Sequence, residues 1–307
     1  MTPARPKFML GLALALALAA GPALAADPVV VSSKIDTEGN LLGNVIAQVL
    51  QANGIAVTNK VALGATPIVR KAITSGEIDI YPEYTGNAAF FFNKADDPLW
   101  KDPAKGYDEA KKLDYDANKI VWLAPAPANN TWAIALLQTV ADGNRLKSLS
   151  DFGKWVAGGG KVKLAGSAEF VNSAAALPAF QTAYGFALKP DQLLVLSGGD
   201  TSATIKAAAE QTDGVNAAMV YGTDGAIGAA GLVVLDDDKG VQPVYAPAPI
   251  VREAVLKANP GIEAALKPVF ASFDLKTLQT LNGRIQVNGE AAKDVAASYL
   301  KSKGFVK

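Results

Sequence analysis

The feature that most constrains the fold of this chain is a regular alternation of short β-rich runs with amphipathic helical runs, beginning at residue 29. Such alternation is typical of α/β proteins in which helices cover a mainly parallel sheet. The expected strands lie at 29–31, 56–63, 78–81, 120–124, 132–137, 162–165, 193–196, 217–221 and 232–235. The expected helices lie at 39–53, 66–76, 151–156, 173–184, 201–210, 252–258, 261–271, 274–282 and 290–303.

Local signals place several boundaries of these elements. Apolar residues at 41, 42, 45, 46, 49 and 50 recur at helical spacing, with Gly54 at the expected stop. Thr66 followed by Pro67 predicts an N-cap and a proline at the first helical position. Gly158-Gly159-Gly160 predicts a turn. The segment Pro82 to Asn87 is polar and turn-forming, and it follows a strand at the carboxyl end, where open α/β sheets bind ligands.

The N-terminus has the pattern of a secretory signal peptide. Arg5 and Lys7 precede an apolar run over 8–20, which is too short for a membrane span. Ala23-Leu24-Ala25 supplies the small residues that signal peptidase needs, so residues 1–25 are expected to be removed, with cleavage after Ala26 as the alternative. We expect the mature protein to be periplasmic.

Composition excludes several kinds of chemistry. The 307 residues contain no Cys and no His, so thiol nucleophiles, disulfides, His-based triads and His-ligated zinc sites are impossible. Carboxylate chemistry, lysine chemistry and binding alone remain, and of these we expect binding without catalysis, with no cofactor and no metal. Cleavage after residue 25 leaves 27 basic against 29 acidic residues, a formal charge of −2, so nucleic acid is not an expected partner.

Four aromatic residues stand beside turn signals at the ends of predicted strands, although aromatic residues make up only 7% of the chain. They are Tyr84, Trp132, Tyr221 and Tyr245. A quaternary ammonium group has no N–H to donate, and electron-rich ring faces can hold its diffuse charge. The four rings therefore indicate either a cage for a cation or a cover over the edge of the core.

The sequence around these rings resembles the osmoprotectant-binding proteins of glycine betaine/choline/carnitine ABC importers, and within them the osmoregulated low-affinity glycine betaine subgroup. The resemblance covers essentially the whole mature chain. It rests on Ser33-Lys34-Ile35-Asp36-Thr37-Glu38, Leu42-Gly43-Asn44, Gly76 to Gly86, Asn130-Thr131-Trp132-Ala133 and Tyr221-Gly222-Thr223-Asp224-Gly225. The word Tyr81-Pro82-Glu83-Tyr84-Thr85-Gly86 is specific within the family.

This resemblance implies a two-lobe type II periplasmic-binding-protein (Venus-flytrap) fold that traps ligand between its lobes. We expect lobe 1 to comprise 26–132 and 244–307, and lobe 2 to comprise 133–243. The implied partners are a small quaternary-ammonium ligand and the permease and ATPase subunits of an importer, and a monomer is expected. The ligand-binding residues that it implies are Tyr84, Trp132, Tyr221, Tyr245, Asn87, Lys34, Asn130 and Asp224.

Departures from the family pattern gather where a ligand carboxylate would bind. Where family members often have a polar residue, this chain has Gly39. Where they often have a short motif with an acidic residue, it has Asn129-Asn130, and no Arg follows Glu169-Phe170. Lys34 and Asn87 remain as weaker anchors. Choline, carnitine, proline betaine and ergothioneine therefore stay open as ligands beside glycine betaine. An enzyme built on this scaffold and a sensor domain are the alternatives of other classes.

Three further acidic features have a structural interpretation. Asp224 is expected to cap the turn or helix that follows it. Glu83 precedes a turn and Glu38 begins a helix, where an acid interacts favourably with the helix dipole. Asp236-Asp237-Asp238 is expected to be a solvated turn, since no spaced calcium-ligand loop surrounds it.

Overall fold

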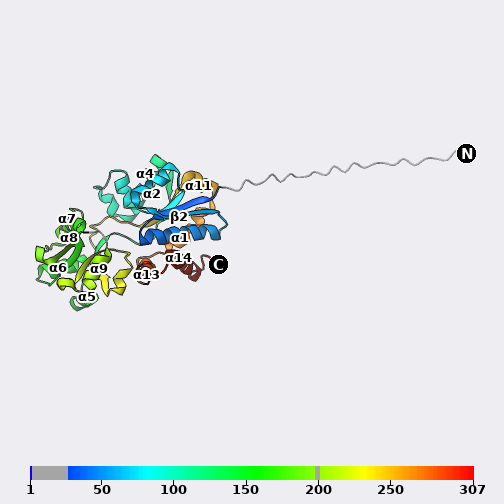
Figure 1. Ribbon diagram of the computed structural model, residues 1–307. Coiled ribbons are helices and arrows are strands. Elements are labelled where there is room, and N and C mark those ends of the chain that lie inside the picture. The colour runs from blue at the N-terminus through cyan, green and yellow to red at the C-terminus, as the bar shows by residue number, and fades with distance from the viewer. Residues whose placement is uncertain (2–26, 198–200) are drawn as a thin grey trace.

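The chain is organised around two five-stranded sheets, as expected for an α/β protein. The computed structural model describes Met1, residues 27–197 and residues 201–307. The expected signal peptide therefore lies outside the described residues, apart from Met1. Figure 1 shows the two sheets in separate bodies joined by extended segments, with the N- and C-terminal parts of the chain in the same body.

The first sheet has the strand order β2-β1-β3-β10-β4. Its strands are β1 (Val29–Lys34), β2 (Val57–Gly64), β3 (Ile80–Tyr84), β4 (Ile120–Trp122) and β10 (Pro247–Arg252). The second sheet has the order β7-β6-β8-β5-β9. Its strands are β5 (Trp132–Leu137), β6 (Leu164–Ser167), β7 (Leu193–Leu196), β8 (Ala217–Tyr221) and β9 (Leu232–Val234).

Four of the five strands in each sheet run in the same direction, as expected for a mainly parallel sheet, and one strand is reversed. In the first sheet β1 runs parallel to β2 and β3, but β10 is antiparallel to β3 and β4. The second sheet repeats this arrangement, with β6 parallel to β7 and β8, and β5 antiparallel to β8 and β9. The antiparallel strand in each sheet is the one that enters after a connection from the other sheet.

Helices cover both sheets. They are α1 (Thr37–Ala52), α2 (Thr66–Ser75), α3 (Asn87–Phe91), α4 (Pro103–Asn118), α5 (Gln138–Asn144), α6 (Leu149–Ala157), α7 (Ala168–Asn172), α8 (Leu177–Tyr184), α9 (Thr201–Ala209), α10 (Ala226–Ala229), α11 (Glu253–Ala258), α12 (Gly261–Ala271), α13 (Leu275–Gln286) and α14 (Ala292–Ser302). Short 3₁₀ turns lie at Pro98–Lys101, Pro190–Gln192 and Thr212–Gly214. None of the helices in the described part of the chain has the length and apolar character needed to cross a membrane.

Several local expectations need correction. The N-cap of α2 is Ala65, and Thr66 is already helical. β3 continues through Pro82, Glu83 and Tyr84, which were expected in a turn, because β10 pairs with it over this stretch. The helix expected at 173–184 begins only at Leu177, as α8, and the separate short helix α7 precedes it.

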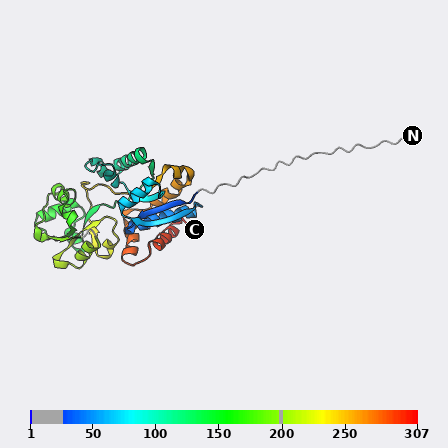
Figure 2. The same ribbon diagram turned by 45° about the horizontal axis from the view of Figure 1, so that its top comes forward.

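The C-terminal helices return to the first sheet, as expected from the sequence. Buried apolar side chains of α12, α13 and α14 share one core with those of α1 and β1, including Leu42, Ile46, Leu266, Leu278 and Leu300. Figures 1 and 2 both show α13 and α14 beside α1. This packing places α13 next to the start of α1, at the edge of the first sheet where the candidate site lies.

Candidate functional site

A cleft of about 480 Å³ lies between the carboxyl ends of strands in the two sheets. Its lining comes from both bodies and from the segments that connect them. The lining residues are Lys34, Asp36, Thr37, Glu38, Thr66, Tyr84, Asn87, Asn130, Thr201, Tyr221, Thr223, Asp224, Tyr245, Asn282 and Gln286. The cleft is therefore polar, tyrosine-containing and built from segments far apart in the sequence.

A buried ion pair forms the wall of the cleft on the side of the first sheet. Lys34, at the end of β1, contacts Glu83 of β3, with 2.5 Å between Nζ and Oε1. The same Glu83 oxygen accepts hydrogen bonds from the Tyr84 backbone N–H at 2.7 Å and from Asn87 Nδ2 at 2.8 Å. The Tyr81 hydroxyl donates to Glu83 Oε2 at 2.8 Å. Lys34 and Asn87 are thus engaged with Glu83.

Thr85 and Gly86, the last two residues of the segment 81–86, position the connecting segment 244–246. The Thr85 hydroxyl donates to the Val244 carbonyl and accepts from the Ala246 N–H, which holds the connecting segment 244–246 against the end of β3. A Cβ at Gly86 would lie 2.8 Å from ring carbons of Tyr245. Only glycine leaves room for that ring, so the segment 81–86 positions Tyr245 as well as Tyr84.

Glu38 is the buried carboxylate of the cleft. Asp36 caps α1 by accepting from the Gly39 N–H at 2.7 Å, which places Glu38 in the first turn of the helix. The Tyr84 hydroxyl donates to Glu38 Oε1 at 2.8 Å, and Asn282 Nδ2 donates to Oε2 at 2.7 Å. Asn130 Nδ2 lies 3.3 Å from Oε1. Burial raises the pKa of Glu38 to about 7, although hydrogen bonds from Thr223, Tyr84 and Asn282 lower it.

The tyrosines of the cleft are neutral phenols. Burial raises the pKa of Tyr245 to about 12, and it also raises the pKa values of Tyr84 and Tyr221 above their ordinary values. Lys34 Nζ lies 4.5 Å from the centroid of the Tyr84 ring, so one cation already contacts this ring. The rings of Tyr221 and Tyr245 remain as apolar and electron-rich surfaces for a ligand.

The cleft brings together seven of the eight residues singled out in the sequence, and it does not include Trp132. Trp132 stacks on Tyr221 with 6.5 Å between ring centroids and lines an adjacent hollow of about 440 Å³. Its other neighbour is Phe170, in an edge-to-face contact at 6.0 Å. Asp224 lines the cleft and accepts from the Tyr221 N–H at 2.8 Å, so it closes the turn that precedes it. The expected cap on the following helix is wrong, because the N-cap of α10 is Gly225 and no side chain caps it.

Sequence reasoning missed Glu38, Asn282 and Gln286 as residues of the cleft. Glu38 was interpreted as a helix-dipole partner, and its position after β1 was the available signal, because carboxyl ends of strands form the site edge. Asn282 and Gln286 lie on α13, whose amphipathic pattern does not show which polar side chains meet a loop of the other body. There, Asn282 donates to the Thr223 carbonyl at 2.9 Å, and Gln286 accepts from the Gly225 N–H at 2.9 Å.

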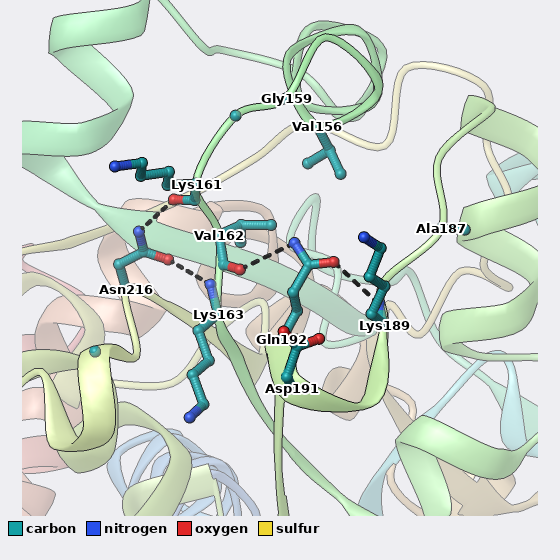
Figure 3. A pocket seen from close by; sticks show the side chains of 12 residues that line it. Val156, Gly159, Lys161, Val162, Lys163, Ala187, Lys189, Asp191, Gln192 and Asn216 are labelled. Atoms are coloured by element: carbon teal, nitrogen blue, oxygen red, sulfur yellow. Dashed lines mark hydrogen bonds between the residues drawn. The ribbon is translucent and has the colours of Figure 1, made fainter.

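A second hollow of about 580 Å³ lies on the second body, below the glycine turn that follows α6. Figure 3 shows that its two amide side chains are used to hold backbone. Asn216 bonds to the Lys161 carbonyl and the Lys163 N–H, and Gln192 bonds to the Val162 carbonyl and the Lys189 N–H. Its lysine ammonium groups point in different directions (Figure 3). We therefore place the site in the tyrosine-lined cleft.

Metal binding has no support in the described part of the chain, where no group of three or more carboxylates could hold an ion. The acidic run at 236–238 is instead a hydrogen-bonded turn. Asp237 accepts from the N–H groups of Val241 and Gln242, and Asp238 accepts from Ser150.

Comparison with known proteins agrees with this geometry. Residues 27–302 match the model of the substrate-binding domain of the ABC-type glycine betaine transport system. The chain is 60% identical over 301 residues to the glycine betaine-binding protein YehZ of Escherichia coli, covering 98% of this chain and 99% of that protein. It is 33% identical over 296 residues to a glycine-betaine-binding protein of Pseudomonas aeruginosa, covering 94% of this chain and 92% of that protein.

A solved structure supports the same assignment. Apo YehZ from E. coli superimposes with a TM-score of 0.87 at 62% identity, covering 92% of this chain and 100% of that chain. The α/β architecture, the two-lobe fold and the expected family are thereby confirmed. The chain belongs to the family of substrate-binding domains of ABC-type glycine betaine transport systems.

Proposed function

We propose that this protein captures glycine betaine or a related quaternary-ammonium osmolyte in the cleft and delivers it to the permease and ATPase subunits of an ABC importer. The observation that carries the proposal is the composition of the cleft. Tyr84, Tyr221 and Tyr245 line it together with three carboxylates, of Asp36, Glu38 and Asp224. Electron-rich rings and acidic side chains favour binding of a diffuse cation. No arginine of the described residues lines the cleft and would compete with that cation for the rings and carboxylates.

The same proposal includes how the protein works. We infer that residues 26–132 with 244–307 form one lobe and 133–243 the other, and that they close on the ligand. The eight residues of the sequence-based site, Trp132 among them, would then act as its ligand-binding residues. We propose export to the periplasm after removal of residues 1–25, a monomeric state and no enzymatic activity.

Other betaine-like or cationic solutes remain candidates, namely choline, carnitine and ergothioneine. One observation favours looking beyond glycine betaine. Lys34 contacts Glu83, and Asn87 donates to the same carboxylate, so both expected anchors for a ligand carboxylate already have a protein partner.

A titration series tests the proposal. Wild-type protein is expected to bind glycine betaine, choline or carnitine by isothermal titration calorimetry, with a matching rise in melting temperature. Tyr245→Ala should weaken binding more than tenfold, because it removes a ring that lines the cleft. Tyr115→Ala is the matched control, since Tyr115 lies on α4 and bonds to Glu253 at the surface. Equal affinities of the two variants would contradict the cleft as the binding site.

A further inference from the structure

The Glu38 carboxylate has no cationic partner in the described chain. Its side-chain oxygens accept hydrogen bonds from Tyr84, Asn282 and Asn130, all neutral groups. None of the ion pairs of the described residues includes it, and the nearest lysine of the cleft, Lys34, contacts Glu83 instead. Glu38 is only 4% exposed. A carboxylate that is this deeply buried and has only neutral hydrogen-bond partners among the described residues is disfavoured in its charged form.

The two amides that donate to Glu38 each have a side-chain oxygen without a hydrogen-bond donor. Asn130 and Asn282 turn their N–H groups toward Glu38, because a carboxylate only accepts hydrogen bonds. The Oδ1 atoms of both amides are buried and have no hydrogen-bond donor in the described structure. Their partial negative charges are therefore not neutralised by any donor.

Tyr84 couples this potential to the ring surface. Its hydroxyl donates to Glu38 at 2.8 Å, which draws the proton away from the phenol oxygen and increases electron density in the ring. A richer ring holds a cation more strongly. The carboxylate and the ring thus both favour positive charge at this end of the cleft, where the Lys34 ammonium already contacts the ring.

We propose that Glu38 is the counter-ion of the ligand's ammonium group and makes the cleft prefer ligands with net positive charge over zwitterions. This inference rests on the proposed function, because it assumes that the cation binds in this cleft. The expected ligand is a quaternary ammonium ion that carries no carboxylate.

Proton release should accompany binding of such a cation. Burial raises the pKa of Glu38 to about 7 in the ligand-free protein, and a nearby cation favours the ionised form. The charged and titratable groups around Glu38 are Tyr84, which donates to it, Asp36 at the N-cap of its helix, the Lys34–Glu83 pair beside Tyr84, Asp224 on the loop of the second body, and the cleft residues Tyr221 and Tyr245. Asn282 and Gln286 are the groups presented by α13, and neither titrates.

Three ligands at two pH values test the proposal. Tetramethylammonium, choline and glycine betaine share the methylated ammonium, but only glycine betaine carries a carboxylate. By titration calorimetry at pH 8, the wild type should bind both cations at least tenfold more tightly than glycine betaine. Their affinities should fall about tenfold at pH 6, because the fraction of ionised Glu38 falls by that factor. Repeating the titrations in buffers of different ionisation enthalpy should show proton release.

Glu38→Gln is the decisive variant, because it keeps the shape and removes the charge. It should abolish the preference for net positive ligands and flatten the pH dependence, whereas Tyr245→Ala should weaken all three ligands to a similar extent at both pH values. A wild type that binds glycine betaine as tightly as tetramethylammonium at pH 8 would overturn the proposal while leaving the proposed function intact. So would a Glu38→Gln protein that keeps the wild-type preference. If none of the three ligands binds, this proposal fails, and the proposed function fails as well if carnitine and ergothioneine do not bind either. The wild-type measurements decide the matter even if Glu38→Gln does not fold.

Discussion

Lys34 and Glu83 form the ion pair that organises the wall of the cleft. The Glu83 side chain is fully buried and that of Lys34 is 7% exposed, so both charges depend on each other and on their hydrogen bonds. Buried pairs of this kind contribute modestly as pairs, but removing one member leaves the other as an isolated buried charge.

Glu83→Gln should therefore destabilise the protein by about 3–5 kcal/mol, because the Lys34 ammonium keeps its burial and loses its carboxylate. The matched control is Glu109→Gln, which breaks the more exposed pair with Lys94 at 2.6 Å and should cost about 1 kcal/mol or less. Urea unfolding of both variants at neutral pH measures the difference. A loss for Glu83→Gln no larger than that of its control would contradict the central role of this pair.

The contribution of Glu38 to the free energy of unfolding of the ligand-free protein should be larger at acid pH than at neutral pH. Its folded pKa of about 7 lies above the ordinary 4.5, so its contribution is fully present below about pH 4.5 and is lost as pH rises through 7. The loss amounts to about 3 kcal/mol. The free energy of unfolding of Glu38→Gln minus that of the wild type should accordingly increase by this amount between pH 4.5 and 8. A constant difference across this range would show that Glu38 is not perturbed by burial.

At the scale of elements, the contact between α13 and the loop before α10 joins the two bodies near the cleft. A Cβ at Gly225 would lie 2.0 Å from the Gly283 nitrogen and 2.2 Å from the Asn282 carbonyl carbon. Both are backbone atoms, which cannot move away as a side chain can. The approach brings Asn282 within reach of Glu38 and Thr223.

Gly225→Ala should separate α13 from this loop and lower both stability and ligand affinity. We expect about 1–3 kcal/mol of destabilisation, the usual cost of overpacking, and weaker binding because Asn282 moves away from Glu38. Gly228→Ala is the control: it lies within α10, nothing lies within 4 Å of its added Cβ, and alanine is the better helix former. Thermal unfolding and titration calorimetry of both variants test this, and equal effects would contradict the close-approach argument.

At the scale of the whole molecule, the placement of Trp132 bears on lobe closure. It stacks on Tyr221 in the same sheet and does not line the cleft, so it can contribute to a ligand site only if the other body moves toward it. The connecting segments already pair side by side, through the Asn130 N–H and the Tyr245 carbonyl at 3.0 Å and through the Tyr245 N–H and Asn129 Oδ1 at 2.8 Å. Bending at these paired segments would close the cleft without disturbing either sheet.

Closure predicts a smaller radius of gyration in small-angle scattering when the protein is saturated with a ligand shown to bind by calorimetry. Tyr245→Ala, measured at the same ligand concentration, is the control for effects of the solute on the scattering. Identical curves for the wild type with and without ligand, at demonstrated saturation, would contradict closure.

Much of the local structure was predictable from the sequence. The strands β5, β7 and β8 and the helix α12 have the expected bounds, because each carries a short β-rich run or a helical repeat that ends at a turn signal. β10 was not predicted, since two prolines interrupt its apolar run and proline normally argues against a central strand. Here it pairs on both sides, a result of how β3 and β4 are placed by the rest of the chain.

From the amino-acid sequence alone one can predict the α/β class, most of the helices and strands, and the polar and aromatic segments at the ends of strands. Those features follow from side-chain periodicity and turn chemistry, which act over a few residues. The three-dimensional structure was needed to show that Glu38 is buried without a cationic partner among the described residues, that Lys34 contacts Glu83, and that Trp132 stacks on Tyr221. Burial and charge pairing depend on contacts between segments such as 34–38, 83 and 282, and no local pattern records which distant side chain will be there.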